Sequence, residues 1–508
     1  MTESRAARFL FLKFTCNNNI MPMSELVLTS IPEPLTAQPK DGIHHLFQAQ
    51  LQHQFVVARS TASERIGKLR RLHAALLRYQ EDIRAALWAD FHKGAFETDV
   101  SEIGVINSEI RYAIRHLRGW MRPRRVATPL TLFGSTSEVR YEPKGVCLIL
   151  SPWNYPFNLT FAPLVSAIAA GNCVILKPSE FTPHSSAVMK KIVAELFLPE
   201  EVALVEGDAA VAEALTHLPF HHIFFTGSPA VGKRVMAAAA KNLASVTLEL
   251  GGKSPVIVDE TADLDNAAAK IAWLKCMNAG QICIAPDYLL VQEKVHDALV
   301  EKIKQQIEKY LGASPEARRT TPDYCRMVNE GHFDRVQSLL DDAVTQGGRV
   351  VQGGQSVRSE RFIDPTILVN VSAGARIWQE EIFGPLLPVQ TFQTLPEAVG
   401  IINARPKSLA MYVFSRGKRQ VEYLLAETRN GGVSVNDCGV HFFNAGLPFG
   451  GANNSGIGKC HGAYGFQEFS NARGVLHQTR FLPSSNFLLP PYGSKLQKNL
   501  VEAIKKWL

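Results

Sequence analysis

Three side chains have the types and local surroundings for nucleophilic and acid–base chemistry: a thiol, a carboxyl group and an amide. Cys283 lies at the centre of NAGQICIAPDYLLV, residues 278–291, where small residues precede the thiol and Pro286 follows it. On such a bend, directly before a strand-like run, a cysteine can expose its sulfur and aim its backbone N–H at the same reacting atom. Free cysteines are among the most buried residue types, so a purely structural cysteine is the alternative.

The carboxyl and amide candidates also lie beside apolar runs. Glu249 is near the end of VTLEL, residues 246–250, and two glycines follow. A carboxylate is costly to bury without a partner, and desolvation raises its pKa toward the range of a general base. Asn154 follows VCLIL, residues 146–150, on the turn SPWNYPF. Its amide can donate to an oxyanion there, although turns also favour asparagine for conformational reasons.

One strand–helix junction offers a site for an anion. In HIFFTGSPAVGKRV, residues 222–235, the chain turns at Gly227 and Ser228 is a plausible N-cap. The N-terminus of the following helix presents free N–H groups, typically to a pyrophosphate. The spacing from Gly227 to Gly232 is neither the G-x-G-x-x-G fingerprint nor a P-loop, so an ordinary strand–helix turn stays open as the alternative.

Two further segments carry groups that suit a dinucleotide. ILKPSE, residues 175–180, leaves Lys177 and Glu180 beyond the carboxyl end of a strand, where open α/β sheets bind ligands. Both side chains suit ribose hydroxyls, and a surface ion pair is the alternative. QEEIFGP carries Glu381, an acid for a second ribose, and Phe383, an aromatic ring that can pack on a nicotinamide.

The elements that must hold these residues alternate between helices and strands. Residues 44–120 have helical periodicity, seen in Ile66, Leu69, Leu72 and Leu76. Short apolar runs rich in β-branched residues then appear at 146–150, 173–177, 203–207, 222–227 and 246–250. Helical stretches separate these runs, which predicts crossover units and a parallel sheet covered on both faces.

A second series of strands and helices begins near residue 254. It contains PVIVD, YLLVQ, a helix around 294–310 and VFS at 413–415. TLTLFGSTSEVRYEP, about residues 129–143, predicts an edge hairpin outside both series that could serve as a dimer arm. The predicted fold class is α/β, with two Rossmann-like parallel-sheet domains and a small β oligomerisation arm.

Composition and charge limit the partners. The 508 residues are 46% hydrophobic and 20% charged, as in ordinary globular proteins, and the net charge of +7 makes no case for nucleic acid. Eight cysteines without a Cys-x-x-Cys pair disfavour zinc and disulfide frameworks, which predicts a reduced, cytoplasmic protein without a metal site. No apolar run reaches the roughly 18–20 residues of a transmembrane helix.

Both ends of the chain carry segments of their own. Residues 1–40 are predicted to be a disordered extension, with Met21 or Met23 as alternative starts. Their apolar patch, residues 9–12, is too short for a signal-peptide core, and a targeting role is the alternative. The amphipathic tail KLQKNLVEAIKKWL, residues 495–508, favours docking on its own dimer, with peripheral contact to an anionic membrane as the alternative.

Seven of these segments occur in the order and at about the spacing of one family: SPWNYPF, ILKPSE, FFTGSPAVGK, LELGGKSP, GQICIAPDY, EEIFGP and PFGGANNSGIG. Over residues 45–480 the chain resembles the aldehyde dehydrogenase superfamily, and the full set is far more specific than any single motif. GQICIAPDY, WMRPRRV and the short N-terminal part are most similar to the class 3 branch, which acts on fatty, aromatic or coniferyl aldehydes.

The resemblance implies a role for each position. Cys283 would be the nucleophile, Glu249 the base that activates water, and Asn154 with the Cys283 backbone N–H the oxyanion hole. The implied reaction oxidises a medium- or long-chain aliphatic or an aromatic aldehyde to a carboxylic acid, through a thiohemiacetal and a thioester, in a homodimer. The implied contacts to NAD or NADP, with NAD favoured, are Trp153, Lys177, Glu180, Thr226, Gly227, Ser228, Gly232, Glu381 and Phe383.

The resemblance also divides the chain into domains. Two stretches form a cofactor-binding domain, a third forms a catalytic domain, and two more are oligomerisation or bridging segments before the tail. The predicted ranges are 41–123 and 144–248 for cofactor binding, 249–445 for catalysis, 124–143 and 471–490 for oligomerisation, and 491–508 for the tail.

One position departs from the family pattern. The glycine-rich stretch LPFGGANNSGIGKCHG, residues 447–462, predicts a loop around the site, with His461 interpreted as structural. Cys460 stands where the family pattern has an aromatic residue, which leaves the shape of the substrate entrance open. Two other functions stay as alternatives: an enzyme that passes the thioester to coenzyme A, against which Glu249 argues, and a nonenzymatic scaffold of the same fold.

Overall fold

The computed structural model describes residues 40–481, 483, 485–486 and 489–507, which contain two large parallel sheets. The predicted extension over residues 1–40 lies outside this part of the chain except for Lys40, where helix α1 begins. The predicted α/β class with two parallel sheets is confirmed. Each sheet is described below with the elements that cover it.

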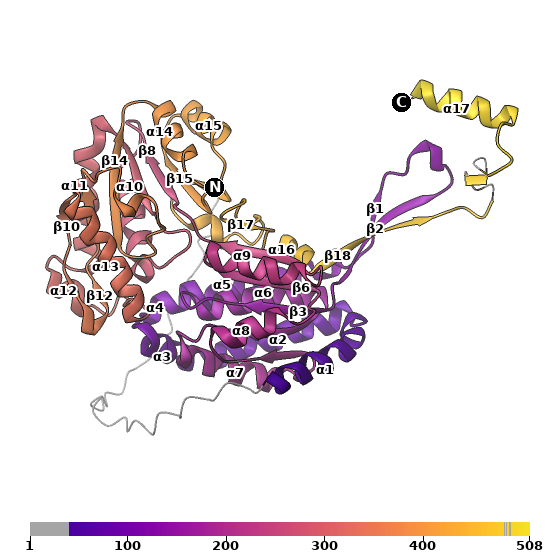
Figure 1. Ribbon diagram of the computed structural model, residues 1–508, viewed down its shortest axis with the longest axis horizontal. Coiled ribbons are helices and arrows are strands. Elements are labelled where there is room, and N and C mark those ends of the chain that lie inside the picture. The colour runs from indigo at the N-terminus through magenta and orange to yellow at the C-terminus, as the bar shows by residue number, and fades with distance from the viewer. Residues whose placement is uncertain (1–39, 482, 484, 487–488, 508) are drawn as a thin grey trace, which may run out of the picture. The chain divides into compact units, whose positions relative to one another are not determined.

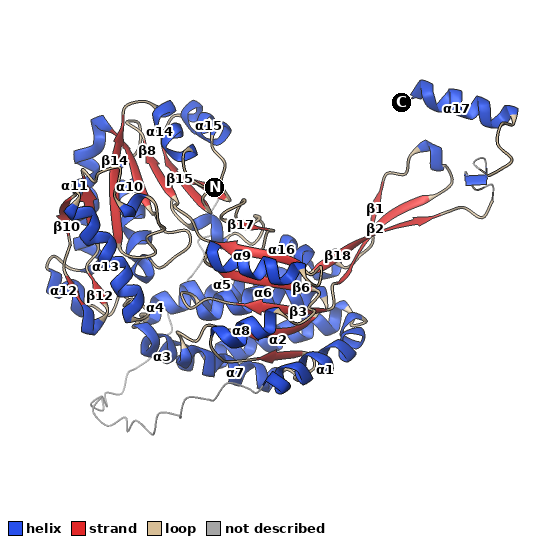
Figure 2. Cartoon of the chain, in the orientation of Figure 1, coloured by secondary structure: helices blue, strands red, loops and turns tan. Residues whose placement is uncertain are grey.

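The first sheet has six strands in the order β17-β7-β6-β3-β4-β5 (Figure 1). All neighbours are parallel except β17, which is antiparallel to β7. Helices lie on both sides of the sheet, which is why its strands are apolar without alternation (Figure 2). The predicted runs are confirmed as β3 (Val146–Leu150), β4 (Cys173–Lys177), β5 (Val202–Leu204), β6 (His222–Gly227) and β7 (Ser245–Leu250), with β17 (Gly456–Ile457) added.

The helices around this sheet follow from the sequence pattern and its caps. Helix α2 begins at a capping box between Thr61 and Glu64, and its predicted apolar positions are buried. Helix α6 ends at Gly171, which has a φ of 90°. The bounds are α1 (Lys40–Ala58), α2 (Ala62–Arg78), α3 (Gln80–Phe91), α4 (Ala95–Thr98), the π-helical turn η1 (Asp99–Ile103), α5 (Gly104–Trp120), α6 (Pro156–Ala170), α7 (Pro183–Leu196), α8 (Ala209–Thr216), α9 (Pro229–Ala240) and α16 (Gly462–Glu468).

The second sheet has seven strands in the order β10-β13-β14-β9-β8-β15-β16, and only β10 runs antiparallel to its neighbour. The predicted helix around 294–310 is confirmed as α11 (His296–Leu311). The strands are β8 (Pro255–Val258), β9 (Tyr288–Gln292), β10 (Arg349–Gln352), β13 (Thr366–Val369), β14 (Leu386–Phe392), β15 (Ala410–Phe414) and β16 (Gly432–Val435). The other helices of this part are α10 (Leu264–Cys276), α12 (Pro315–Thr320), α13 (Glu330–Thr345), α14 (Leu395–Asn403) and α15 (Lys418–Glu427).

The predicted hairpin over residues 129–143 is only half right. Residues 130–132 form a 3-10 turn, and β2 (Thr136–Pro143) pairs with β1 (Arg124–Val126) and with β18 (Ser470–His477). The local alternation cannot reveal β18, because that partner lies far away in the sequence. The role of this three-stranded sheet in oligomerisation stays a prediction.

Two smaller features complete the description. Strands β11 (Ser356–Val357) and β12 (Phe362–Ile363) form a separate antiparallel pair. The tail forms helix α17 (Lys495–Trp507). Among the helices that the structure describes, none combines the length and the apolar character needed to cross a membrane.

Candidate active site

Cys283 lies in the connection between α10 and β9, after the short turn η3 (Met277–Gly280). Asn278 and Ala279 in this turn have φ angles of 49° and 50°, in the left-handed region that is unfavourable for residues other than glycine. Hydrogen bonds hold the segment that follows: the Tyr412 hydroxyl donates to the Ile284 carbonyl at 2.6 Å. The loop is therefore tightly fixed around a half-buried thiol.

Glu249 is buried on β7, and among the described residues its carboxyl group has no nitrogen or oxygen partner, while the Cys460 thiol lies beside it. Burial raises its pKa to about 8, which outweighs the opposite effects of the Cys460 thiol and the Lys459 ammonium group. At neutral pH the carboxyl group is therefore largely protonated in this state. A pKa in this range suits a group that accepts and releases a proton during catalysis.

The thiol of Cys283 is also held in its protonated form. Burial raises its pKa, and the carboxyl groups of Glu381 and Glu249 raise it further by disfavouring the thiolate. A neighbouring base or positive charge is therefore needed to form the nucleophilic thiolate.

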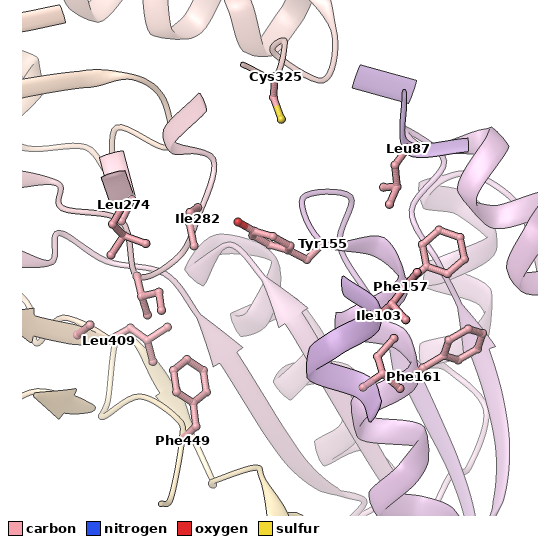
Figure 3. Packing of buried hydrophobic residues seen from close by; sticks show 14 of the residues in the cluster. Leu87, Ile103, Tyr155, Phe157, Phe161, Leu274, Ile282, Cys325, Leu409 and Phe449 are labelled. Carbon is pink, nitrogen blue, oxygen red and sulfur yellow. The ribbon is translucent and has the colours of Figure 1, made fainter. Parts of the chain in front are cut away.

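Cys283 and Glu249 line the same cavity, which has a volume of about 950 Å³ with its open mouth included. Figure 3 shows Leu274, Ile282, Leu409 and Phe449 around this region, with the hydroxyl end of Tyr155 pointing toward Ile282. The cavity walls are largely apolar and aromatic, with further contributions from Leu159, Trp273, Met277, Ile284, Phe442 and Phe443. Such walls fit an apolar substrate better than a charged one.

Asn154 lies beside the cavity rather than on its wall. Its side-chain amide donates to the carbonyl of Gln281 at 3.0 Å, two residues before the thiol. An amide NH₂ group has two N–H donors, so one remains for another acceptor. The structure thus brings all three candidates, Cys283, Glu249 and Asn154, to one region, as the sequence predicts; their roles stay predictions.

The predicted adenosine end of the cofactor site lies at the carboxyl edge of the six-stranded sheet. The Lys177 ammonium group is 3.2 Å from a carboxyl oxygen of Glu180, and the lysine is the more buried of the two. The Ser228 hydroxyl accepts from the N–H of Val231 at 3.4 Å and caps α9. A Cβ on Gly232 would lie 2.8 Å from the Leu250 side chain, so close packing against Leu250 also explains a glycine at this position.

The predicted nicotinamide end contains a buried acid and two aromatic rings. Burial raises the pKa of Glu381 to about 8, and one of its oxygens lacks a partner within the described part of the chain. The rings of Trp153 and Phe383 meet edge to face, with centroids 5.4 Å apart. The Thr226 hydroxyl, at the end of β6 before Gly227, is buried and likewise has no partner among those residues.

The sequence patterns indicate a structural His461 but miss several other buried polar groups of this region, including Glu109. Nδ1 of His461 lies 3.3 Å from Oε1 of Glu109, and both residues line the cavity. Burial raises the pKa of Glu109 to about 7 and lowers that of His461 to about 4, so the histidine is neutral at pH 7. The other missed groups, Lys93 and Glu102, form a fully buried ion pair. No sequence pattern links Lys93 to Glu102, so only the fold reveals the pair.

The fold and the cavity define the class of protein: an α/β enzyme with a thiol and a carboxyl group in one apolar pocket. The sequence profile of the aldehyde dehydrogenase family matches residues 16–475, and the chain belongs to this family. The predicted identity and enzyme class are therefore confirmed: an NAD(P)-dependent oxidoreductase that acts on aldehydes.

Three similar proteins place the chain more closely. It is 43% identical over 435 residues to 4,4'-diaponeurosporen-aldehyde dehydrogenase of Staphylococcus aureus, covering 86% of this chain and 93% of that one. It is 41% identical to aldehyde dehydrogenase family 3 member B1 of Rattus norvegicus, covering 90% and 96%. The substrate-bound structure of Staphylococcus aureus AldH superposes with a TM-score of 0.86 at 41% identity, covering 90% and 99%. These similarities confirm the predicted class 3-like branch.

Proposed function

We propose that the chain oxidises a medium- or long-chain aliphatic, or an aromatic, aldehyde to the carboxylic acid. The observation that carries this proposal is that the Cys283 thiol and the Glu249 carboxyl group line one apolar cavity. The size and apolar walls of the cavity support a large hydrophobic substrate. One similar protein, at 43% identity, is named for 4,4'-diaponeurosporen-aldehyde, which supports the same direction.

Each group has a defined part in the proposed reaction. The Cys283 sulfur, after losing its proton, attacks the carbonyl carbon, and the Asn154 amide with the Cys283 backbone N–H stabilises the oxyanion. A nicotinamide ring, when bound, would supply the acceptor for the hydride of the thiohemiacetal carbon. Glu249, in its ionised form, then takes a proton from water; the oxygen attacks the thioester carbon, the C–S bond breaks, and the acid and the Cys283 thiolate are released.

The residues present fit a dinucleotide. Two buried oxygen atoms, one on Thr226 and one on Glu381, have no hydrogen-bond partner among the described residues and can accept from a bound ligand. Lys177 and Glu180 suit the adenosine ribose, α9 suits the pyrophosphate, and Glu381 suits the nicotinamide ribose. Glu180 would repel a 2′-phosphate, so we favour NAD over NADP.

The Cys283→Ala variant tests the nucleophile. We expect turnover to fall by at least about 10³-fold because no covalent intermediate can form, while NAD binding, measured by fluorescence titration, stays as in the wild type. Initial rates with straight-chain and aromatic aldehydes, with NAD and NADP in parallel, define the substrate and cofactor preference. Unchanged turnover in the variant would refute the proposed mechanism.

Product analysis separates hydrolysis from acyl transfer. We expect the free carboxylic acid to form without coenzyme A, because the role proposed for Glu249 is to activate water. A strict requirement for coenzyme A would instead favour the acylating enzyme that the sequence left open.

A further inference from the structure

A fully buried ion pair lies beneath the turn that carries Asn154. Lys93, between α3 and α4, places its ammonium group 2.7 Å from a carboxyl oxygen of Glu102, and neither side chain is exposed to solvent. The ammonium group also lies 3.9 Å from the centre of the Tyr155 ring. Glu102 belongs to the π-helical turn η1, an uncommon element that often marks functional sites.

Stability alone is a weak reason for such a pair. Removing two charges from water has a large desolvation penalty, and replacing a buried ion pair by apolar residues is often neutral or stabilising. The remaining contacts of Lys93 and Glu102 therefore show better what the pair does. Their side-chain hydrogen bonds outside the pair lead to the 154–158 segment.

The pair holds the main chain on both sides of Tyr155. Lys93 donates to the Asn154 carbonyl at 3.2 Å, and Glu102 accepts from the Asn158 N–H at 2.9 Å. The side-chain amide of Asn278 donates to the same Asn154 carbonyl at 2.9 Å. Two donors from separate elements thus fix one carbonyl group of the turn.

The second donor connects this turn to the segment with the thiol. Asn278 also donates to the Gln281 carbonyl at 3.1 Å, which is the group that receives the Asn154 side-chain amide. Asn278 itself has the unfavourable φ of 49°. Hydrogen bonds therefore connect the strained turn before Cys283 to both the main-chain carbonyl and the side-chain amide of Asn154.

We propose that Lys93 and Glu102, together with Asn278, are positioning residues: they hold the Asn154 turn so that its amide faces the oxyanion formed at Cys283. This inference rests on the proposed function of Cys283 and Asn154. None of the three positioning residues touches the reacting atoms.

Two variants remove the support in different ways. Lys93→Met with Glu102→Gln removes both charges of the pair together and keeps an acceptor for the Asn158 N–H. Asn278→Gly removes the second donor at a φ that glycine adopts readily. Ala279→Gly is the matched control, because it gives the same backbone freedom at the neighbouring φ of 50° without removing a donor.

Four measurements on the full chain decide the outcome: thermal melting, NAD binding, kcat and KM for the best aldehyde, and the rate of Cys283 alkylation by iodoacetamide. We expect both variants to fold and bind NAD as the wild type does, with kcat lowered by about 10- to 100-fold and KM unchanged. Alkylation forms no oxyanion, so we expect its rate to stay within about twofold, because the variants misplace the oxyanion donor and not the thiol. Ala279→Gly should keep the wild-type kcat.

Two results would overturn the inference. The first is wild-type kcat in the double variant and in Asn278→Gly; if the double variant does not fold, Asn278→Gly alone decides. The second is alkylation that slows as much as kcat, since the residues would then position the thiol instead of Asn154. Failure of the proposed function is a separate result, because it appears as full turnover in Cys283→Ala.

Discussion

The carboxyl group of Glu249 is only 5% exposed and lies in a cavity with few polar groups. Burial raises the pKa of Glu249, and the same surroundings raise the pKa of the Cys283 thiol. Both groups are thus protonated at neutral pH in the state described. We infer that the apolar pocket that suits the substrate also delays ionisation of the nucleophile until a charge or a base comes close.

The raised pKa of Glu249 predicts a pH-dependent stability difference. Its folded-state pKa, about 8, lies above the ordinary value of 4.5, so between these two pH values the folded state keeps a proton that the unfolded state has lost. Rising pH then lowers the free energy of unfolding of the wild type by up to roughly 1.4 kcal/mol per pH unit. Glu249→Gln lacks this loss, so its stability relative to the wild type should increase between about pH 5 and 8 and level off above.

Thermal melting of both proteins without cofactor, from acidic to alkaline pH, measures this difference. Other titrating groups cancel in the comparison because both proteins contain them. A difference that stays constant with pH would contradict the assigned pKa shift.

At the scale of elements, the connection between β7 and β8 brings Gly251 close to the predicted site residue Glu381. Gly251 directly follows β7, and a Cβ at this position would lie 2.1 Å from one carboxyl oxygen of Glu381 and 2.3 Å from the other. A glycine is therefore required here by close approach of a buried carboxyl group. The sequence shows the two glycines after Glu249 but not what approaches them.

The Gly251→Ala variant tests this contact. The new methyl group displaces Glu381 or forces the backbone to move, at a cost of about 1–3 kcal/mol. We expect a higher KM for NAD and a lower melting temperature, with little change in the KM for the aldehyde. Gly67→Ala, in α2 with nothing within 4 Å of the new Cβ, is the control and should leave the KM for NAD unchanged.

At the scale of the whole molecule, exposed apolar residues lie in the 3-10 turn between β1 and β2, just after β18, and on the tail. Leu130 is 78% exposed and Phe481 is 90% exposed. On α17, Leu496 is 60% exposed and Val501 is 48% exposed. Apolar groups of this kind are often covered by another protein surface, and we expect a second copy of the chain to cover them.

Deleting residues 494–508 tests the tail. We expect the truncated protein to dissociate at concentrations about tenfold higher or more than the full chain, as measured by analytical ultracentrifugation, because an apolar contact is lost. Flotation with anionic liposomes is measured in parallel, and we expect no difference there. Loss of liposome binding without a change in association would show that the tail serves a membrane surface instead.

Local sequence was sufficient for the parallel strands of the six-stranded sheet, the family and the set of candidate groups. The apolar runs around Cys147 and Val174 predicted strands because buried parallel strands need apolar residues on both faces. The motifs around Asn154, Glu249 and Cys283 predicted the chemistry because each residue type suits one step. The hairpin prediction is wrong over residues 129–135 because alternation of residue types alone cannot show whether a partner strand exists.

Only the tertiary structure decided which groups surround the candidates. Lys93 and Asn154 are 61 residues apart, and no periodicity links them. The contacts of Glu109 with His461, and of Gly251 with Glu381, likewise join distant parts of the chain. Residue types and spacing determine the local conformation and the reactions that the side chains could perform. Burial, pKa values and the fixed direction of an amide depend instead on packing between segments that are far apart in the sequence.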